Sequence, residues 1–136
     1  MPWRPAHLRT RLTLWYMAIL AALLKEPGHE FLTDEVLGAA VASTVNLAEV
    51  QAFLVKQGAD PAEAWKRAIV PVSQVIPFSS EQARVAGTLV SETRIFGLSL
   101  GDRACLALAL ELNAVVYTAD KAWKKLNIGI PIRVIR

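Results

Sequence analysis

Apolar residues occur along this chain in two kinds of run that alternate from one end to the other. Short runs rich in β-branched residues are typical of buried strands, and longer runs with helical spacing are typical of helices. The pattern predicts strands over residues 12–16, 41–45, 72–78, 114–118 and 132–135. It predicts helices over residues 18–25, 46–58, 60–70, 79–95, 100–113 and a short one from 121. This alternation predicts an α/β fold, a three-layer α/β/α sandwich around a mostly parallel sheet.

Two of the predicted helices begin with residues that suit a helix start. Asp60 is followed by Pro61 and Glu63, which places an acceptor at the N-cap, proline at the first helical position and an acid at the third. Ser79 and Gln82 have the same spacing, which predicts a second capping box. These starts fix where the predicted helices lie along the chain.

Composition limits the class of protein. With 136 residues, of which 54% are hydrophobic, one domain can bury a full core. A single cysteine, Cys105, and two histidines exclude a disulfide scaffold and a zinc site made from Cys and His alone. A reducing compartment, the cytoplasm, is the simplest location for such a chain.

The net charge of +3 is concentrated at the start of the chain. Arg4, Arg9 and Arg11 precede the first acid, Glu26, so residues 1–13 carry the whole excess. The apolar residues that follow resemble a signal peptide, but they are too few to span a bilayer and no small-residue cleavage site follows them. We therefore expect no membrane segment, an atypical basic segment over residues 1–13 and one domain over residues 14–136.

Three acids lie close to the starts of predicted helices. Glu49, Asp102 and Asp120 each lie at or near the first turn of a helix that follows a strand or a loop. In an open parallel sheet, ligands bind at the edge where the carboxyl ends of the strands meet. A structural role is the alternative for each acid: Glu49 in a capping box with Asn46, Asp102 in one with Ser99, and Asp120 as an N-cap.

Three segments around these acids resemble one family. They are residues 46–50 (NLAEV), 97–109 (GLSLGDRACLALA) and 117–123 (YTADKAW), and they are similar to the segments around the second, third and fourth acids of PIN-domain ribonucleases of the VapC toxin type. With the helix expected from residue 18, the resemblance covers roughly residues 17–136. It implies a flavodoxin-like α/β/α fold and a toxin that is neutralised by a cognate VapB-type antitoxin, with a homodimer as the usual assembly.

The resemblance also implies a chemistry. Carboxylates of the family bind Mg²⁺ or Mn²⁺, which prefer oxygen ligands, and the metal activates water to hydrolyse RNA phosphodiester bonds. On this basis Asp102 and Asp120 are expected as principal metal ligands, and Glu49 as a ligand directly or through water. Thr118 and Ser43 are weaker candidates for orienting water or phosphate.

The chain departs from the family pattern at its first acid. Where the family has Asp-Ala-Ser before the first helix, this chain has Trp15, Tyr16 and Met17, and no acid precedes Glu26. An indole donates one hydrogen bond and ligates no metal. Two explanations stay open: residues 1–17 are an aberrant start on an intact ribonuclease, or the chain is a degenerate PIN-like module that binds antitoxin or RNA without cleaving. A nucleotide-binding module is disfavoured, because the glycines form neither G-x-G-x-x-G nor a P-loop.

Overall fold

The fold is taken from a computed structural model that describes residues 12–135. Five strands form one sheet in the order β3-β2-β1-β4-β5, and all neighbouring strands are parallel. The strands are β1 (Leu12–Leu14), β2 (Ala40–Ser43), β3 (Gln74–Ile76), β4 (Val115–Thr118) and β5 (Ile132–Val134). The α-helices are α2 (Tyr16–Leu24), α3 (Asp34–Gly38), α4 (Thr44–Lys56), α5 (Pro61–Ile69), α6 (Ser80–Thr88), α7 (Val90–Thr93) and α8 (Leu100–Leu112). Short 3₁₀ helices are η1 (His29–Phe31), η2 (Arg94–Phe96) and η3 (Lys121–Lys125).

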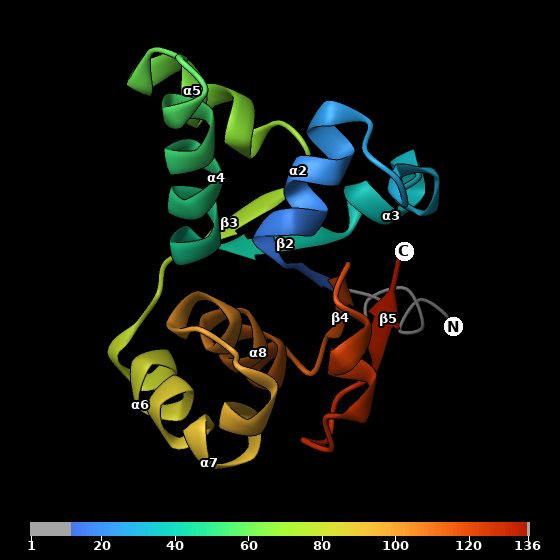
Figure 1. Cartoon of the computed structure of the whole chain (residues 1–136), viewed down its shortest axis with the longest axis vertical. Helices are drawn as coiled ribbons and strands as arrows, with labels where there is room; N and C mark the ends of the chain where they lie inside the picture. Colours follow the sequence, from blue (N-terminus) through green and yellow to red (C-terminus); the bar gives the residue numbers. More distant parts are fainter. Residues whose placement is uncertain (1–11, 136) are drawn as a thin grey trace, which may run out of the picture.

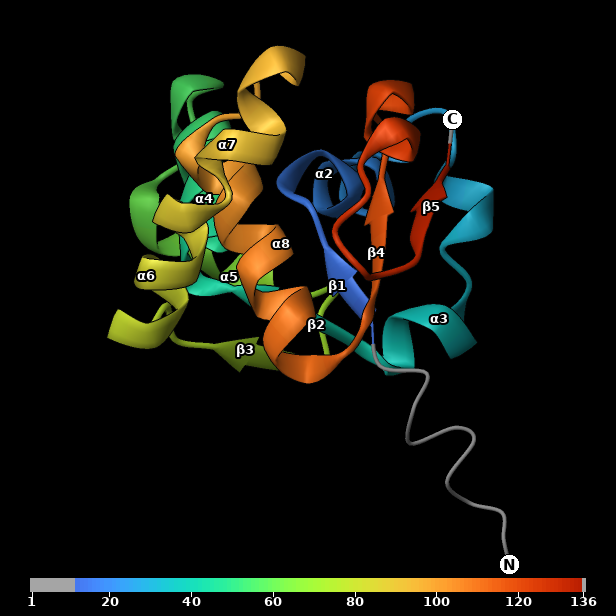
Figure 2. The same ribbon diagram turned by 90° about the horizontal axis from the view of Figure 1, so that it is seen from below.

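The sheet separates two layers of helices. In Figure 1 the sheet lies between α2, α4 and α5 above it and α6, α7 and α8 below it, and Figure 2 shows the strands side by side. Side chains of a strand alternate between the two faces, so Leu14 and Ala42 pack with the first helix layer and Val116 packs with the second. The predicted α/β/α sandwich with a parallel sheet is therefore confirmed.

The ends of several elements differ from the predicted ones. The strands are shorter, and the helix predicted over residues 79–95 is divided into α6, α7 and η2. The Thr93 hydroxyl donates to the backbone oxygen of Leu89 at 2.8 Å, and Gly97 ends the segment at a φ of +70°. The short helix predicted from residue 121 is 3₁₀, and the pattern missed η1 and α3, although Thr33 caps α3 by accepting from the Val36 amide.

The predicted helix starts are confirmed in part. Asp60 accepts from the amides of Ala62 and Glu63, and Ser79 accepts from the amide of Gln82. The second half of the Ser79 box is absent, because the Gln82 side chain donates to Glu111 on α8 instead.

The basic segment predicted over residues 1–13 falls almost wholly outside the described residues, and β1 crosses its predicted end. Within residues 12–135, no helix combines the length and the apolar character that crossing a bilayer requires.

Candidate active site

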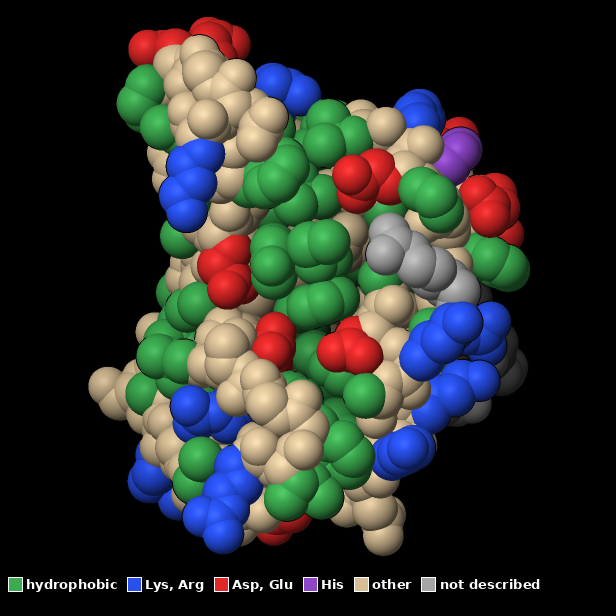
Figure 3. Space-filling view, viewed as in Figure 1, with side chains coloured by type: hydrophobic (Ala, Val, Ile, Leu, Met, Phe, Trp, Pro, Cys, Tyr) green, Lys and Arg blue, Asp and Glu red, His purple; other side chains and the backbone are tan. Residues whose placement is uncertain are grey.

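The carboxyl ends of β2 and β4 lead into α4 and η3, where Glu49 and Asp120 lie, whereas Asp102 lies in the first turn of α8, which follows η2. Figure 3 shows acidic side chains across the middle of the face above this edge, and the basic side chains visible there lie mostly at its margins. The main chain is held by hydrogen bonds at each of these turns, so the positions of the acids follow from the fold.

Glu49 is held by a buried amide. Ser43, the last residue of β2, caps α4 by accepting from the Val45 amide at 3.1 Å. One turn later the Nδ2 of Asn46 donates to Glu49 Oε1 at 2.9 Å and to the Gly101 backbone oxygen on α8 at 3.0 Å. The Asn46–Glu49 capping box suggested by the sequence is wrong, because α4 begins two residues before Asn46 and Ser43 takes the N-cap. Asn46 instead joins α4 to α8 and orients Glu49.

The Glu49 carboxylate lies directly over Gly101. A Cβ at position 101 would lie 2.6 Å from Glu49 Cδ, well inside van der Waals contact. Glycine at position 101 therefore lets the Glu49 carboxylate keep this place over the first turn of α8.

Asp102 has a hydrogen-bond donor on each carboxylate oxygen. Oδ2 accepts from the Ser99 amide at 2.8 Å and the Ser99 hydroxyl accepts from the Asp102 amide at 3.2 Å, so the capping box suggested by the sequence is present. Oδ1 accepts from the indole Nε1 of Trp15 at 2.5 Å.

Trp15 lies where β1 turns into α2. Its amide donates to the Tyr117 oxygen on β4 at 3.2 Å, and its own oxygen accepts from the first turn of α2. The ring centroid lies 5.2 Å from that of Trp123, which is fully buried, and 5.3 Å from that of Tyr16. These contacts hold the indole in place against Asp102.

Asp120 lies near Trp15, because both residues line one hollow. Its amide donates to the buried hydroxyl of Thr118 at 3.1 Å, and its Oδ1 caps η3 by accepting from the Ala122 amide at 2.9 Å. An open hollow of about 430 Å³ here is lined by Trp15, Met17, Ala119, Asp120 and Lys121. Glu49 lines a different hollow of about 250 Å³, together with Tyr16, Ala52, Phe53 and Lys56.

The electrostatics couple Glu49 with Asp102. Burial raises the pKa of Glu49; the Asn46 hydrogen bond opposes this rise, and the nearby Asp102 charge adds to it. Burial also raises the pKa of Tyr16, and the charges of Glu49 and Asp102 raise it further. The charges of Glu49 and Asp102 therefore both act on Tyr16, and the charge of Asp102 also acts on Glu49.

The residues around Trp15 do not fit a divalent cation. Within residues 12–135, no group of three or more His, Cys, Asp or Glu side chains is placed to hold a metal ion. The Trp15 indole already donates to Asp102, and Trp15 also lines the hollow that contains Asp120. The assignment of Glu49, Asp102 and Asp120 as metal ligands stays a prediction, as do supporting roles for Thr118 and Ser43, whose hydroxyls here hold main-chain amides.

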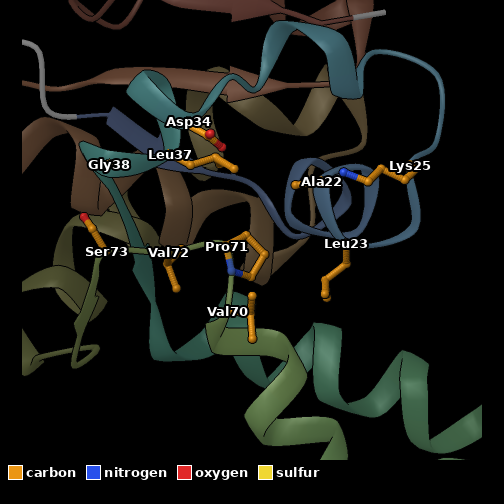
Figure 4. A pocket seen from close by; sticks show the side chains of 10 residues that line it. All are labelled: Ala22, Leu23, Lys25, Asp34, Leu37, Gly38, Val70, Pro71, Val72 and Ser73. Carbon is orange, nitrogen blue, oxygen red and sulfur yellow. The ribbon is translucent and has the colours of Figure 1, made fainter.

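Another hollow lies at the opposite edge of the sheet. It measures about 550 Å³ and is formed by the end of α2, by α3 and by the loop before β3, as Figure 4 shows. Lys25, Asp34 and Ser73 are its polar side chains, and the rest of its lining is apolar or glycine. This hollow lies at the amino-terminal edge of the sheet, and Glu49, Asp102 and Asp120 do not line it. Its residues therefore add no candidate chemistry to the acidic site.

Comparison with known families agrees with the segments around the acids. The model of the PIN domain family matches residues 17–129. This chain belongs to the PIN domain family. The match begins at residue 17, two residues after Trp15. It therefore does not include Trp15, which stands where the family pattern has its first acid.

Solved structures share the fold of this PIN domain. The VapBC2 structure from Rickettsia felis bound to a promoter DNA fragment has 20% identity and a TM-score of 0.69, over 92% of this chain and 98% of that chain. DNA-bound VapBC from Salmonella typhimurium has 15% identity and a TM-score of 0.72, over 93% and 99%. FitAcB from Neisseria gonorrhoeae has 15% identity and a TM-score of 0.65, over 89% and 95%. No curated protein matches this chain.

Three residues that shape this PIN domain site were missed or misread from sequence. The sequence predicts a cap for Asn46, no role for Gly101 and only a missing ligand at Trp15. In the structure Asn46 donates to the Gly101 oxygen, Gly101 makes room for Glu49, and Trp15 donates to Asp102. A glycine in the first turn of a helix is the one signal that pointed to a close approach. Arg103, next to Asp102 in sequence, donates to the Ala86 oxygen on α6 at 2.9 Å.

Proposed function

We propose that this chain is a PIN-domain protein of the VapC toxin type that binds a cognate antitoxin and RNA on a ribonuclease scaffold, with its hydrolytic centre closed by Trp15. Membership of the PIN family and the likeness to several VapBC toxin–antitoxin structures support the scaffold and the antitoxin. The hydrogen bond from the Trp15 indole to Asp102 supports the closed centre, and it is the observation on which the proposal depends.

The closed centre follows from the donors that the acids already have. Asp102 accepts from Trp15 and Ser99, Asp120 accepts from the Ala122 amide, and Glu49 accepts from Asn46. These hydrogen bonds occupy acceptor positions of the three carboxylates, and an indole offers no lone pair to a metal. The chain therefore keeps the acids of the site without the arrangement that hydrolysis needs.

Binding to partners does not require that arrangement. Large apolar side chains are exposed on the described surface, notably Phe31, Val70, Ile95 and Leu100, and such residues suit contacts with an amphipathic antitoxin segment or a second copy of the chain. The likeness to VapBC complexes favours the antitoxin as the main partner.

A second candidate is an active Mg²⁺- or Mn²⁺-dependent endoribonuclease that uses Glu49, Asp102 and Asp120. The coupling of Glu49 with Asp102 across the α4–α8 contact favours it. The two candidates differ in whether the chain cuts RNA as it stands.

Incubation of the purified chain with bulk tRNA tests the proposal. We expect the tRNA to be retained in a filter-binding assay and to stay intact with excess Mn²⁺ or with EDTA. Cleavage that needs Mn²⁺ and is lost in Asp102→Asn would contradict the closed centre and establish the second candidate. If the tRNA is neither retained nor cleaved, RNA binding by this scaffold is refuted.

A further inference from the structure

The main chain at position 15 is fixed independently of the side chain it carries. Its amide extends the β1–β4 ladder by donating to Tyr117, and its oxygen accepts from the amides of Ala18 and Ile19 at 2.9 and 3.0 Å. Trp15 is also the N-cap of α2, and its side chain caps none of the free amides of that helix. Any residue at this position is thus directed from the end of β1 toward the edge that carries Asp102 and Asp120.

The Trp15 ring lies at that edge of the sheet, in the position where a carboxylate site would hold a cation. It places a positively polarised N–H on Asp102 Oδ1, and Trp15 also lines the hollow that contains Asp120. A hydrogen-bond donor neutralises part of a carboxylate's charge and gives it a partner, which removes part of the need for a bound ion. The ring is also packed against buried Trp123, so it cannot leave the edge without losing that contact.

We propose that Trp15 takes the place of a divalent cation in this PIN domain, so that this single side chain blocks a site for Mg²⁺ or Mn²⁺ and its replacement by aspartate opens one. The inference rests on the proposed closed centre, but it concerns cation binding and makes no claim about RNA. An aspartate at position 15 would remove the ring that contacts Asp102 beside the Asp120 hollow and supply an oxygen ligand. It would also give α2 the side-chain acceptor that its N-cap lacks.

Calorimetric titration with Mn²⁺ alone, together with thermal unfolding, tests the inference. For the unaltered chain we expect no binding heat and no change in Tm when Mn²⁺ is added or EDTA removes trace metal. For Trp15→Asp we expect saturable binding and a rise in Tm of about 10 °C at Mn²⁺ about a hundredfold above its Kd.

Two matched variants separate the ring from the charge. Trp15→Asn removes the ring and offers an N-cap acceptor without a negative charge, so we expect binding at least tenfold weaker than in Trp15→Asp. Trp15→Phe keeps a ring without the N–H, and we expect it to bind no Mn²⁺. Adding Asp120→Asn to Trp15→Asp should weaken binding by a similar factor.

Two results would overturn the inference. One is stoichiometric Mn²⁺ binding by the unaltered chain, a measurement that needs no variant to fold. The other is a Trp15→Asp chain that is folded by circular dichroism and binds no Mn²⁺. A Trp15→Asp chain that binds Mn²⁺ without cutting tRNA would leave the inference intact and count only against the ribonuclease scaffold.

Discussion

The close approach of Glu49 to Gly101 gives a prediction whose size follows from the structure. In Gly101→Ala the new methyl group would meet the Glu49 carboxyl, with Cβ 2.6 Å from Cδ. The end of a glutamate side chain can rotate away, so the main cost is the hydrogen bond that Glu49 then loses from Asn46. A hydrogen bond to a charged group contributes about 1.5–3 kcal/mol, and replacing a helical glycine by alanine returns about 1 kcal/mol. The net expectation is a loss of about 0.5–2 kcal/mol.

Gly87 provides the matched control. It also lies within a helix, α6, and a Cβ there would meet nothing within 4 Å. Gly87→Ala should therefore increase the free energy of unfolding by about 0.5–1 kcal/mol. Urea denaturation measures both variants, with m unchanged.

A double-mutant cycle identifies the cause. In an Asn46→Ala background the hydrogen bond to Glu49 is already gone, so Gly101→Ala should no longer be destabilising. If Gly101→Ala stabilises the chain as much as Gly87→Ala does, Glu49 is not held over Gly101 and the reasoning is refuted.

Three further predictions concern single side chains. Glu49→Gln should become more stable than the unaltered chain as pH rises above 4.5. Because the folded state raises the pKa of Glu49, this residue stabilises the fold fully below pH 4.5, and its contribution is lost as pH rises through the folded pKa. Denaturation curves that give the same difference in stability at all pH values would contradict this. Asp60→Ala removes the acceptor for the Ala62 and Glu63 amides and should lower the free energy of unfolding by about 1 kcal/mol, whereas no change in the urea midpoint would mean that the cap is not formed in solution. Burial raises the pKa of Cys105 to about 12, so iodoacetamide at mildly alkaline pH should label it only after unfolding; fast labelling of the folded chain, followed by mass spectrometry, would disprove its burial.

The sequence predicted the layers of the fold because local patterns carry that information. Strand and helix alternate, and Asp60 and Ser79 mark helix starts through interactions within one turn. The ends of strands were less predictable, since β3 is three residues long where seven were expected, and pairing with β2 decides its length.

The site was predictable only in its separate parts. The position of each acid follows from a local turn, and the capping roles of Asp102 and Asp120 were anticipated as alternatives. The contacts between the parts join residues far apart in sequence: Trp15 with Asp102, and Asn46 with Gly101. No local pattern encodes such pairs, so the role of Trp15 as a donor needed the structure.

The central claim is that the Trp15 indole, rather than a cation, is the partner of the Asp102 Oδ1 atom. Two-dimensional ¹⁵N–¹H spectra report it directly, with the Trp15 Nε1–H resonance assigned by its loss in Trp15→Phe. We predict that this resonance moves strongly in Asp102→Asn and that substoichiometric Mn²⁺, which broadens signals of nearby nuclei, leaves it sharp. Selective broadening of the Trp15 and Trp123 indole signals by Mn²⁺ in the unaltered chain would contradict the account.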